Sequence, residues 1–132
     1  MDSDPHSTLR SIAVGRRALE GELGLPARPR GLVIFAHGSG SSRHSPRNAF
    51  VAERLRSRGF ATLLFDLLTE SEAMHRANVF DIDLLASRVA EAIRWARHDA
   101  DTRDLPVGLF GASTGAAAAL VAAAEEPGEV AA

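Results

Sequence analysis

The chain has 132 residues, 45% of them apolar, which suits one domain with a hydrophobic core. Its net charge of −2 gives no electrostatic footprint for nucleic acid, and without cysteine there is no disulfide framework, thiolate metal site or thiol chemistry. The longest apolar stretch, residues 115–124, is shorter than the ~20 residues that span a bilayer, and residues 1–11 lack the apolar core of a secretory signal. We therefore expect a cytoplasmic protein with no membrane or nucleic-acid partner.

The first part of the chain predicts a loose terminus, a hairpin and a buried strand. Residues 1–10 are polar and contain a proline, so we expect a flexible tail. Residues 11–14 and 17–23 alternate roughly between apolar and polar side chains around Gly15, which predicts an antiparallel hairpin. The continuous apolar run over residues 32–36 is typical of a central strand buried on both faces of a parallel sheet.

The rest of the chain predicts alternating helices and strands. Apolar residues recur at three- and four-residue steps after Asp81, which is a helical period. Residues 67–78 have no clear period and are expected as a surface excursion. We expect helices over 48–58, 81–98 and 116–124, and strands over 60–65 and 105–110. This order, a hairpin followed by βαβαβα, indicates an α/β fold with a mostly parallel sheet and flanking helices.

One turn matches the pattern of a catalytic nucleophile. Gly111-Ala112-Ser113-Thr114-Gly115 fits G-x-S-x-G and stands between a hydrophobic strand and an Ala-rich helix, the setting that a nucleophile elbow requires. Ser113 would take a strained backbone conformation there, and Gly111 and Gly115 would avoid clashes in so sharp a turn. The helix N-terminus would favour an oxyanion. The alternative is a glycine-rich turn without chemistry, or one that binds an anion.

A second glycine-rich loop, HGSGSS over residues 37–42, follows the strand at 32–36. Its glycines would let the backbone approach a substrate closely. A Walker A phosphate loop is excluded because the chain has no lysine, and a dinucleotide fingerprint is excluded because Arg43 stands where its third glycine should be.

With these two motifs in this order, the chain resembles the N-terminal half of an α/β-hydrolase of the dienelactone-hydrolase-like group. The resemblance rests on GLVIFAHGSGSSRHSPRN, FATLLFDLLT and LFGASTGAAAAL, and it covers residues 11–132. It implies a partial α/β-hydrolase fold and an enzyme that cleaves an ester or lactone-like bond of a small acyl substrate, without cofactor or metal. True dienelactone hydrolases carry Cys where this chain has Ser113, which favours an esterase-like assignment.

The resemblance also implies roles for individual residues. Ser113 would be the nucleophile, and the backbone N–H groups of Ser39 and Thr114 would form the oxyanion hole. Four residues would give the site structural support: His37, Gly38, Gly111 and Gly115.

A serine nucleophile needs a base and an orienting acid, which in this fold follow it in chain order. The sequence after Ser113 contains neither Asp nor His, and we expect its glutamates to cap the last helix: Glu125, Glu126 and Glu129. We therefore interpret the chain as a truncated domain, inactive alone, whose last strand is an uncovered sheet edge.

Upstream residues leave some alternatives open. His44 and His75 lie in expected loops and could act as the base. Asp66 ends a strand at the same sheet edge, either as a loop-stabilising acceptor or as the triad acid. The remaining histidines are expected in the tail, as support of the glycine-rich loop and as a solvated helix end: His6, His37 and His98.

Two other functions compete with the hydrolase. One is a non-catalytic α/β-hydrolase-like binding module. The other is a phosphate-binding α/β domain that uses HGSGSS.

Overall fold

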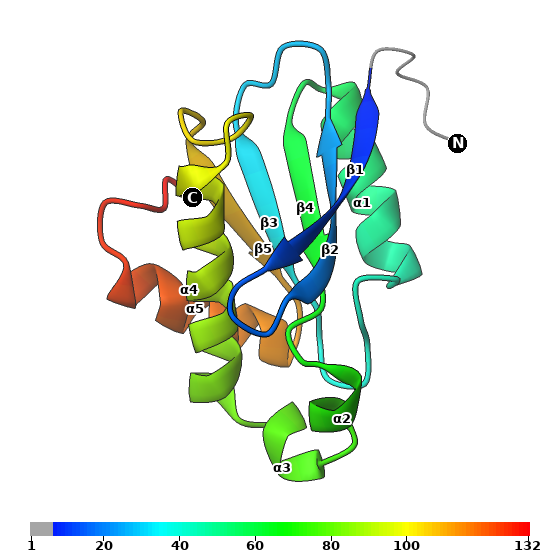
Figure 1. Ribbon diagram of the computed structural model, residues 1–132, viewed down its shortest axis with the longest axis vertical. Helices are drawn as coiled ribbons and strands as arrows, with labels where there is room; N and C mark the ends of the chain where they lie inside the picture. The colour runs from blue at the N-terminus through cyan, green and yellow to red at the C-terminus, as the bar shows by residue number, and fades with distance from the viewer. Residues whose placement is uncertain (1–6) are drawn as a thin grey trace.

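The structure is a computed structural model that describes residues 7–132. Within these residues, five strands form one mixed sheet in the order β1-β2-β4-β3-β5 (Figure 1). The strands are β1 (Thr8–Val14), β2 (Leu19–Leu25), β3 (Leu32–Ala36), β4 (Ala61–Phe65) and β5 (Val107–Gly111). The helices are α1 (Pro46–Ser57), α2 (Glu70–Ala73), α3 (Arg76–Val79), α4 (Ile82–His98) and α5 (Thr114–Glu125).

Three neighbouring strands of the sheet, β4, β3 and β5, are parallel. β3 lies between β4 and β5 and is parallel to both, while β2 joins antiparallel to β4. Helices α4 and α5 cover one face and α1 covers the other, so the expected α/β class is confirmed. The carboxyl ends of β3 and β4 point to the end of the molecule where α2 and α3 lie (Figure 1). Loops at this sheet edge are where such folds place their sites.

The hairpin between β1 and β2 is shifted from its expected position. β2 begins at Leu19 rather than at residue 17, because the turn takes up residues 15–18. Gly15 has a φ of 73° and Ala18 a φ of 51°, and the Ala18 N–H donates to the Gly15 carbonyl at 3.1 Å. This left-handed pair reverses the chain in four residues, which the alternation of side chains does not reveal.

β1 begins at Thr8, so the expectation of a flexible tail is wrong for residues 8–10. Antiparallel pairing with β2 runs to the first residue of the strand. The Arg10 guanidinium then anchors the strand through an ion pair with Asp99 at 2.5 Å. The other part of the expected tail, residues 1–6, lies outside the described residues.

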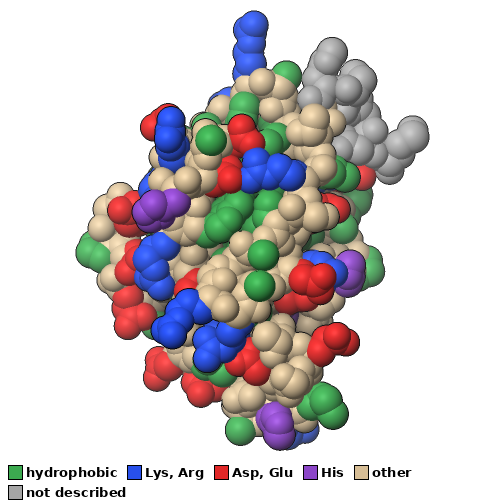
Figure 2. All heavy atoms as spheres, viewed as in Figure 1, with side chains coloured by type: hydrophobic (Ala, Val, Ile, Leu, Met, Phe, Trp, Pro, Cys, Tyr) green, Lys and Arg blue, Asp and Glu red, His purple; other side chains and the backbone are tan. Residues whose placement is uncertain are grey.

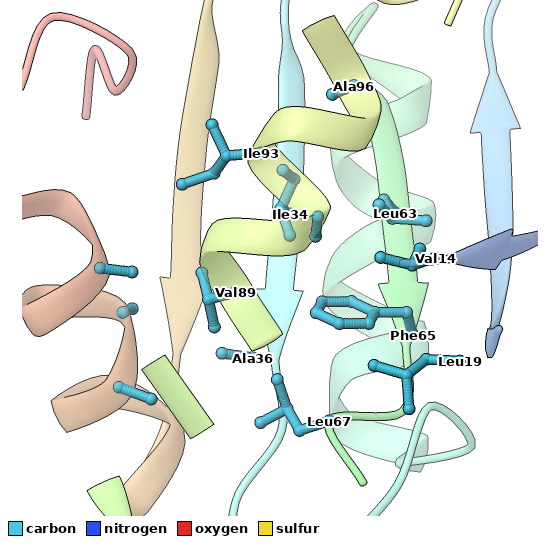
Figure 3. Close-up of a cluster of buried hydrophobic side chains, with 14 of the residues drawn as sticks. Val14, Leu19, Ile34, Ala36, Leu63, Phe65, Leu67, Val89, Ile93 and Ala96 are labelled. Carbon is cyan, nitrogen blue, oxygen red and sulfur yellow. The ribbon is translucent and has the colours of Figure 1, made fainter. Parts of the chain in front are cut away.

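The main core lies between the sheet and α4 (Figure 3). Ile34, Leu63 and Phe65 of the central strands pack against Val89 and Ile93 of α4, and each is at most 1% exposed. The α4 positions are those that the three- and four-residue steps predict. A smaller cluster fills the face under α1: Phe35, Ala52 and Leu64.

Residues 67–78, expected as a surface excursion without a clear period, contain two buried leucines and two short helices. Leu67 and Leu68 are buried, and the one-turn helices α2 and α3 follow. The Thr69 hydroxyl accepts from the Glu72 N–H at 3.2 Å, and the Glu72 carboxylate accepts from the Thr69 N–H at 2.9 Å. This reciprocal capping box was readable in the sequence as T-x-x-E. A four-residue helix is too short to show a helical period, so side-chain periodicity does not predict helices in residues 67–78.

The outer edge of β5 is partly covered by residues 131–132. The Leu109 N–H donates to the Ala132 carbonyl at 2.9 Å, and the Ala131 N–H donates to the Val107 carbonyl at 2.7 Å. The expectation of an uncovered edge is therefore wrong for the first half of this strand.

The glutamates after α5 tie the end of the chain to α4. Glu126 lies 3.4 Å from Arg94 and Glu129 lies 2.7 Å from Arg97. The expected role as a helix cap is confirmed for Glu126, which is the C-cap residue of α5 and whose N–H donates to the Ala122 carbonyl, and it is wrong for Glu129. Acidic and basic side chains intersperse over this face (Figure 2). No helix among residues 7–132 combines the length and apolarity needed to cross a membrane.

Candidate active site

Ser113 occupies the turn between β5 and α5 with φ 58° and ψ −128°. Residues with a Cβ rarely adopt this region, so the strain expected from the sequence is present. Ser113 is the N-cap of α5, yet its side chain makes no capping bond, and no hydrogen bond within residues 7–132 involves its hydroxyl. The strained turn therefore holds an exposed hydroxyl that no other group uses.

Glycines flank Ser113 because the backbones meet there. A methyl group on Gly115 would lie 2.1 Å from the Ala36 carbonyl oxygen and 2.6 Å from that of His37. A methyl group on Gly111 would lie 2.6 Å from the Gly115 carbonyl oxygen. Since these distances are too short for any side chain, α5 can pack on the end of β3 only with glycine at both positions.

His37 fastens the glycine-rich loop to the end of β4. Its Nε2 accepts from the Leu67 N–H at 3.0 Å, and its Nδ1 lies 2.9 Å from the Gly38 carbonyl oxygen. An amide can only donate, so the proton of the ring belongs on Nδ1, which donates to Gly38. With both nitrogens engaged, His37 links two strand ends and is not available to Ser113.

The loop after β3 runs alongside the elbow. A methyl group on Gly38 would lie 3.4 Å from the Ser113 Cβ and 3.2 Å from the Ala112 carbonyl oxygen. The next residue in the loop is Ser39, and the next residue in the elbow is Thr114. Within residues 7–132 neither of their amides donates a hydrogen bond. Two uncommitted N–H donors therefore belong to segments that meet at Ser113.

A cavity of about 310 Å³ opens beside these segments. It is lined by loop residues 37–42 and Thr114 and by residues 66–70 together with Ala73 of α2, Val79 of α3 and Leu85 of α4. The Thr114 hydroxyl is buried without a partner among the described residues. Ser113 precedes Thr114 in the chain and is not itself among the lining residues.

Asp66 stabilises the loop rather than standing free in the cavity. Its carboxylate accepts from the Arg43 N–H at 2.8 Å and from the Arg43 guanidinium at 2.5 Å. Both oxygens are thus taken by one residue of the glycine-rich segment. Of the two alternatives left by the sequence, the structure favours the loop-stabilising acceptor.

Among residues 7–132, no histidine hydrogen-bonds to Ser113. His44 and His75 are exposed, and neither hydrogen-bonds to Ser113, while His98 is bonded to a carbonyl of its own helix. His6 lies outside the described residues. Among residues 7–132 no three His, Asp or Glu side chains gather as a metal site would require.

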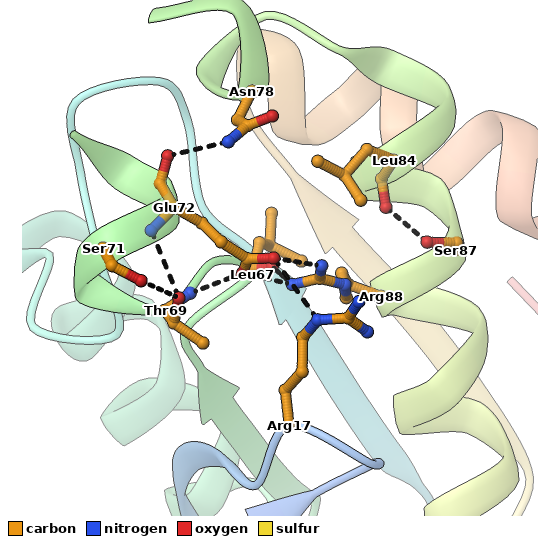
Figure 4. Close-up of polar contacts among 9 residues, drawn as sticks. All are labelled: Arg17, Leu67, Thr69, Ser71, Glu72, Asn78, Leu84, Ser87 and Arg88. Atoms are coloured by element: carbon orange, nitrogen blue, oxygen red, sulfur yellow. Dashed lines mark hydrogen bonds and ion pairs between the residues drawn. The ribbon is translucent and has the colours of Figure 1, made fainter. Parts of the chain in front are cut away.

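Sequence reasoning missed a buried ion pair behind the cavity wall (Figure 4). Arg88 of α4, with a side chain only 1% exposed, donates to the two carboxylate oxygens of Glu72 at 2.8 and 2.7 Å and to the Leu67 carbonyl at 3.1 Å. These hydrogen bonds from Arg88 lower the pKa of Glu72 to about 2, against the opposing effect of burial. A signal was available, since Arg88 interrupts the apolar stripe of α4 beside Val89.

Comparison with known proteins places this geometry in a family. Residues 27–132 match the family model described as "Serine aminopeptidase, S33", and the chain belongs to the α/β-hydrolases of the dienelactone-hydrolase-like type. The crystal structure of dienelactone hydrolase from Anabaena variabilis ATCC 29413 is similar, with 52% identity and a TM-score of 0.88 over 98% of this chain and 62% of that one.

Two further proteins define the range of the similarity. The Mycobacterium tuberculosis (strain ATCC 25618 / H37Rv) protein named "Putative phosphoribosyl transferase Rv0571c" is 61% identical over 114 residues, which are 86% of this chain. The chain spans only 26% of that relative. The α/β serine hydrolase XC6422 of Xanthomonas campestris, 24% identical with a TM-score of 0.71 over 92% of this chain and 57% of that one, shares the fold.

Proposed function

We propose that the chain forms the nucleophile-bearing part of a serine hydrolase that cleaves an ester or similar acyl bond of a small molecule. The observation that carries this proposal is Ser113, held at positive φ with an uncommitted hydroxyl. The Ser113 Oγ would attack the acyl carbonyl, and the amides of Ser39 and Thr114 would donate to the developing oxyanion. The Oγ–acyl bond would form as the ester C–O bond breaks, and water would then release the acid.

We further propose that the base and its orienting acid come from outside residues 7–132. Two observations support this: no histidine among these residues bonds to Ser113, and the chain spans 62% of the similar dienelactone hydrolase. The base would take the Ser113 proton during attack and return it to the leaving alcohol. Residues 7–132 alone would then be inactive toward esters.

The test is the Ser113→Ala change in the full-length protein, with p-nitrophenyl butyrate as substrate. Loss of the nucleophile should lower kcat at least about 10³-fold with little change in KM. Ser87→Ala, a change at an exposed serine of α4, is the matched control and should leave both constants unchanged. Turnover retained in Ser113→Ala would reject the nucleophile.

The name of the mycobacterial relative supplies a second candidate, in which loop 37–42 binds a phosphate. The supporting observation is the 61% identity. The matched segment is 26% of that protein, so a transferase activity can belong to its other three quarters. Thermal stabilisation of this chain by ribose 5-phosphate would favour the phosphate site. A full-length protein that binds acyl ligands but turns none over would instead favour a binding module.

A further inference from the structure

We propose that the cavity beside Ser113 takes an uncharged acyl group and discriminates against acyl groups that carry a carboxylate or phosphate. This inference rests on the proposed hydrolase function and names the substrate class of the same site.

Outside the glycine-rich loop, most of the residues that line the cavity are aliphatic. The aliphatic side chains that line it come from the end of β4, from α2, from α3 and from the first turn of α4: Leu67, Leu68, Ala73, Val79 and Leu85. Such a surface gains free energy when it removes an alkyl group from water, and it offers nothing to replace the hydration of an anion. The volume of about 310 Å³ is at the small end of ligand cavities.

The charges at the cavity have one sign. Within residues 7–132, two carboxylates and no arginine line it. Asp66 is matched by Arg43 at 2.5 Å. Glu70, exposed at the start of α2, has no ion pair among the described residues. The cavity therefore keeps one uncompensated negative charge.

Two arginines that hydrogen-bond to residues of the cavity lining already have carboxylate partners. The Arg88 guanidinium is buried and bonded to Glu72 and to the Leu67 carbonyl. Arg43 donates to Asp66 and also lies 3.6 Å from Glu20. Within residues 7–132, a substrate anion would find no guanidinium in the cavity lining, and it would meet the like charge of Glu70. A single like charge near the surface weakens binding by roughly three- to tenfold.

The same charges disfavour a phosphoribosyl substrate, because its phosphate groups would meet the amides of Ser39 and Thr114 but no lining arginine, and they would be repelled by Glu70. The lining of the cavity therefore favours the proposed hydrolase over the phosphate-binding alternative.

Two esters of equal acyl length test the inference in the full-length protein: p-nitrophenyl hexanoate and the mono-p-nitrophenyl ester of adipic acid. After correction for uncatalysed hydrolysis, we expect kcat/KM for the neutral ester to be at least about tenfold higher at low salt, mainly through KM. The ratio of kcat/KM for the neutral ester to kcat/KM for the adipate ester should fall by about threefold or more in Glu70→Gln, and also at high salt in the unchanged protein. Glu22→Gln, on the exposed side of β2, should leave it unchanged. Equal or faster turnover of the adipate ester would overturn the inference.

If neither ester is hydrolysed, the proposed function fails, and a binding measurement on the 132-residue chain still decides the inference. We would titrate the ¹⁵N-labelled chain with hexanamide, hexanoate and inorganic phosphate and follow its backbone amides by NMR. Hexanamide should shift the amides of residues 38–42 and 67–73, and the two anions should not at equal concentration. Comparable shifts with either anion, or none with hexanamide, would contradict the inference.

Discussion

At the scale of the residue, Ser113 stores strain at the point where chemistry is proposed. Its φ of 58° costs a residue with a Cβ about 1–3 kcal/mol, which the packing of α5 against β3 must offset. The sequence predicted this conformation because Gly111 and Gly115 frame the serine. It could not predict that His37 would be bonded at both nitrogens, since one partner, Leu67, is 30 residues away.

The strain is measurable by comparing two variants that both lack the hydroxyl. The free energy of unfolding in urea should be about 1 kcal/mol higher for Ser113→Gly than for Ser113→Ala. Glycine adopts positive φ without strain, and this gain exceeds the loss that comes from the greater entropy of glycine in the unfolded chain. Equal stability of the two variants would show that Ser113 is not strained.

The close approach of α5 to β3 makes a second prediction at this scale. Gly115→Ala would set a methyl group 2.1 Å from the Ala36 carbonyl oxygen, so it should destabilise the fold by about 3 kcal/mol or more. The matched control is Gly108→Ala in β5, where the methyl group would meet its nearest neighbour at 3.5 Å, and its effect should be under about 1 kcal/mol. Urea unfolding of both variants checks this difference.

At the scale of the element, the Glu72–Arg88 pair joins α2 to α4 and fixes the aliphatic lining of the cavity. Arg88 bonds to the carbonyl of Leu67, whose amide bonds to His37, so this lining and the glycine-rich loop share one hydrogen-bonded chain. The periodicity of apolar residues predicted α4 well. It cannot predict the ion pair between Glu72 and Arg88, because these residues are 16 positions apart and belong to two different helices. The capping box at Thr69 was the one local signal of α2.

This pair predicts how stability depends on pH. The folded pKa of Glu72, about 2, lies below its ordinary value of 4.5. Its stabilisation is therefore fully present above about pH 5 and is lost as pH falls toward 2. Glu72→Gln should destabilise the fold by about 2 kcal/mol at pH 7, with the difference vanishing near pH 2.

The control for this experiment is Glu70→Gln in the same short helix. Glu70 has no ion pair among the described residues, so the change should cost under about 0.5 kcal/mol at any pH. Chemical denaturation of both variants across pH 2–7 provides the measurement. A pH-independent loss in Glu72→Gln would mean that the carboxylate charge does not stabilise the fold.

At the scale of the whole molecule, two residues near the end of the chain, Ala131 and Ala132, partly cover the β5 edge of an open sheet. The alternation of strands and helices and the buried strands could be predicted from the sequence, because a continuous apolar run such as 32–36 is typical of a buried strand. The order of the strands in the sheet was not predicted. The covering of β5 by residues 131–132 could not be predicted, because it consists of two backbone hydrogen bonds and backbone bonds leave no pattern in the side chains. The sequence likewise did not predict that Glu126 and Glu129 would form ion pairs with Arg94 and Arg97.

Deleting residues 130–132 tests the edge. It removes the bonds to Leu109 and Val107, and we expect a loss of about 1–3 kcal/mol together with self-association in sedimentation velocity. Ala131→Pro, which removes the single N–H donor to Val107, should give a smaller loss. A monomeric deletion variant of unchanged stability would mean that these residues do not protect the edge.

The central claim is that Ser113 is a nucleophile, and covalent trapping tests it most directly. The full-length protein would be treated with a fluorophosphonate, digested with trypsin and mapped by mass spectrometry. Cleavage after Arg103 yields a peptide that begins at Asp104, and Ser113 is the one serine in residues 104–132. The account predicts the adduct on this peptide. An adduct on a different serine, or ester turnover without any adduct here, would contradict it.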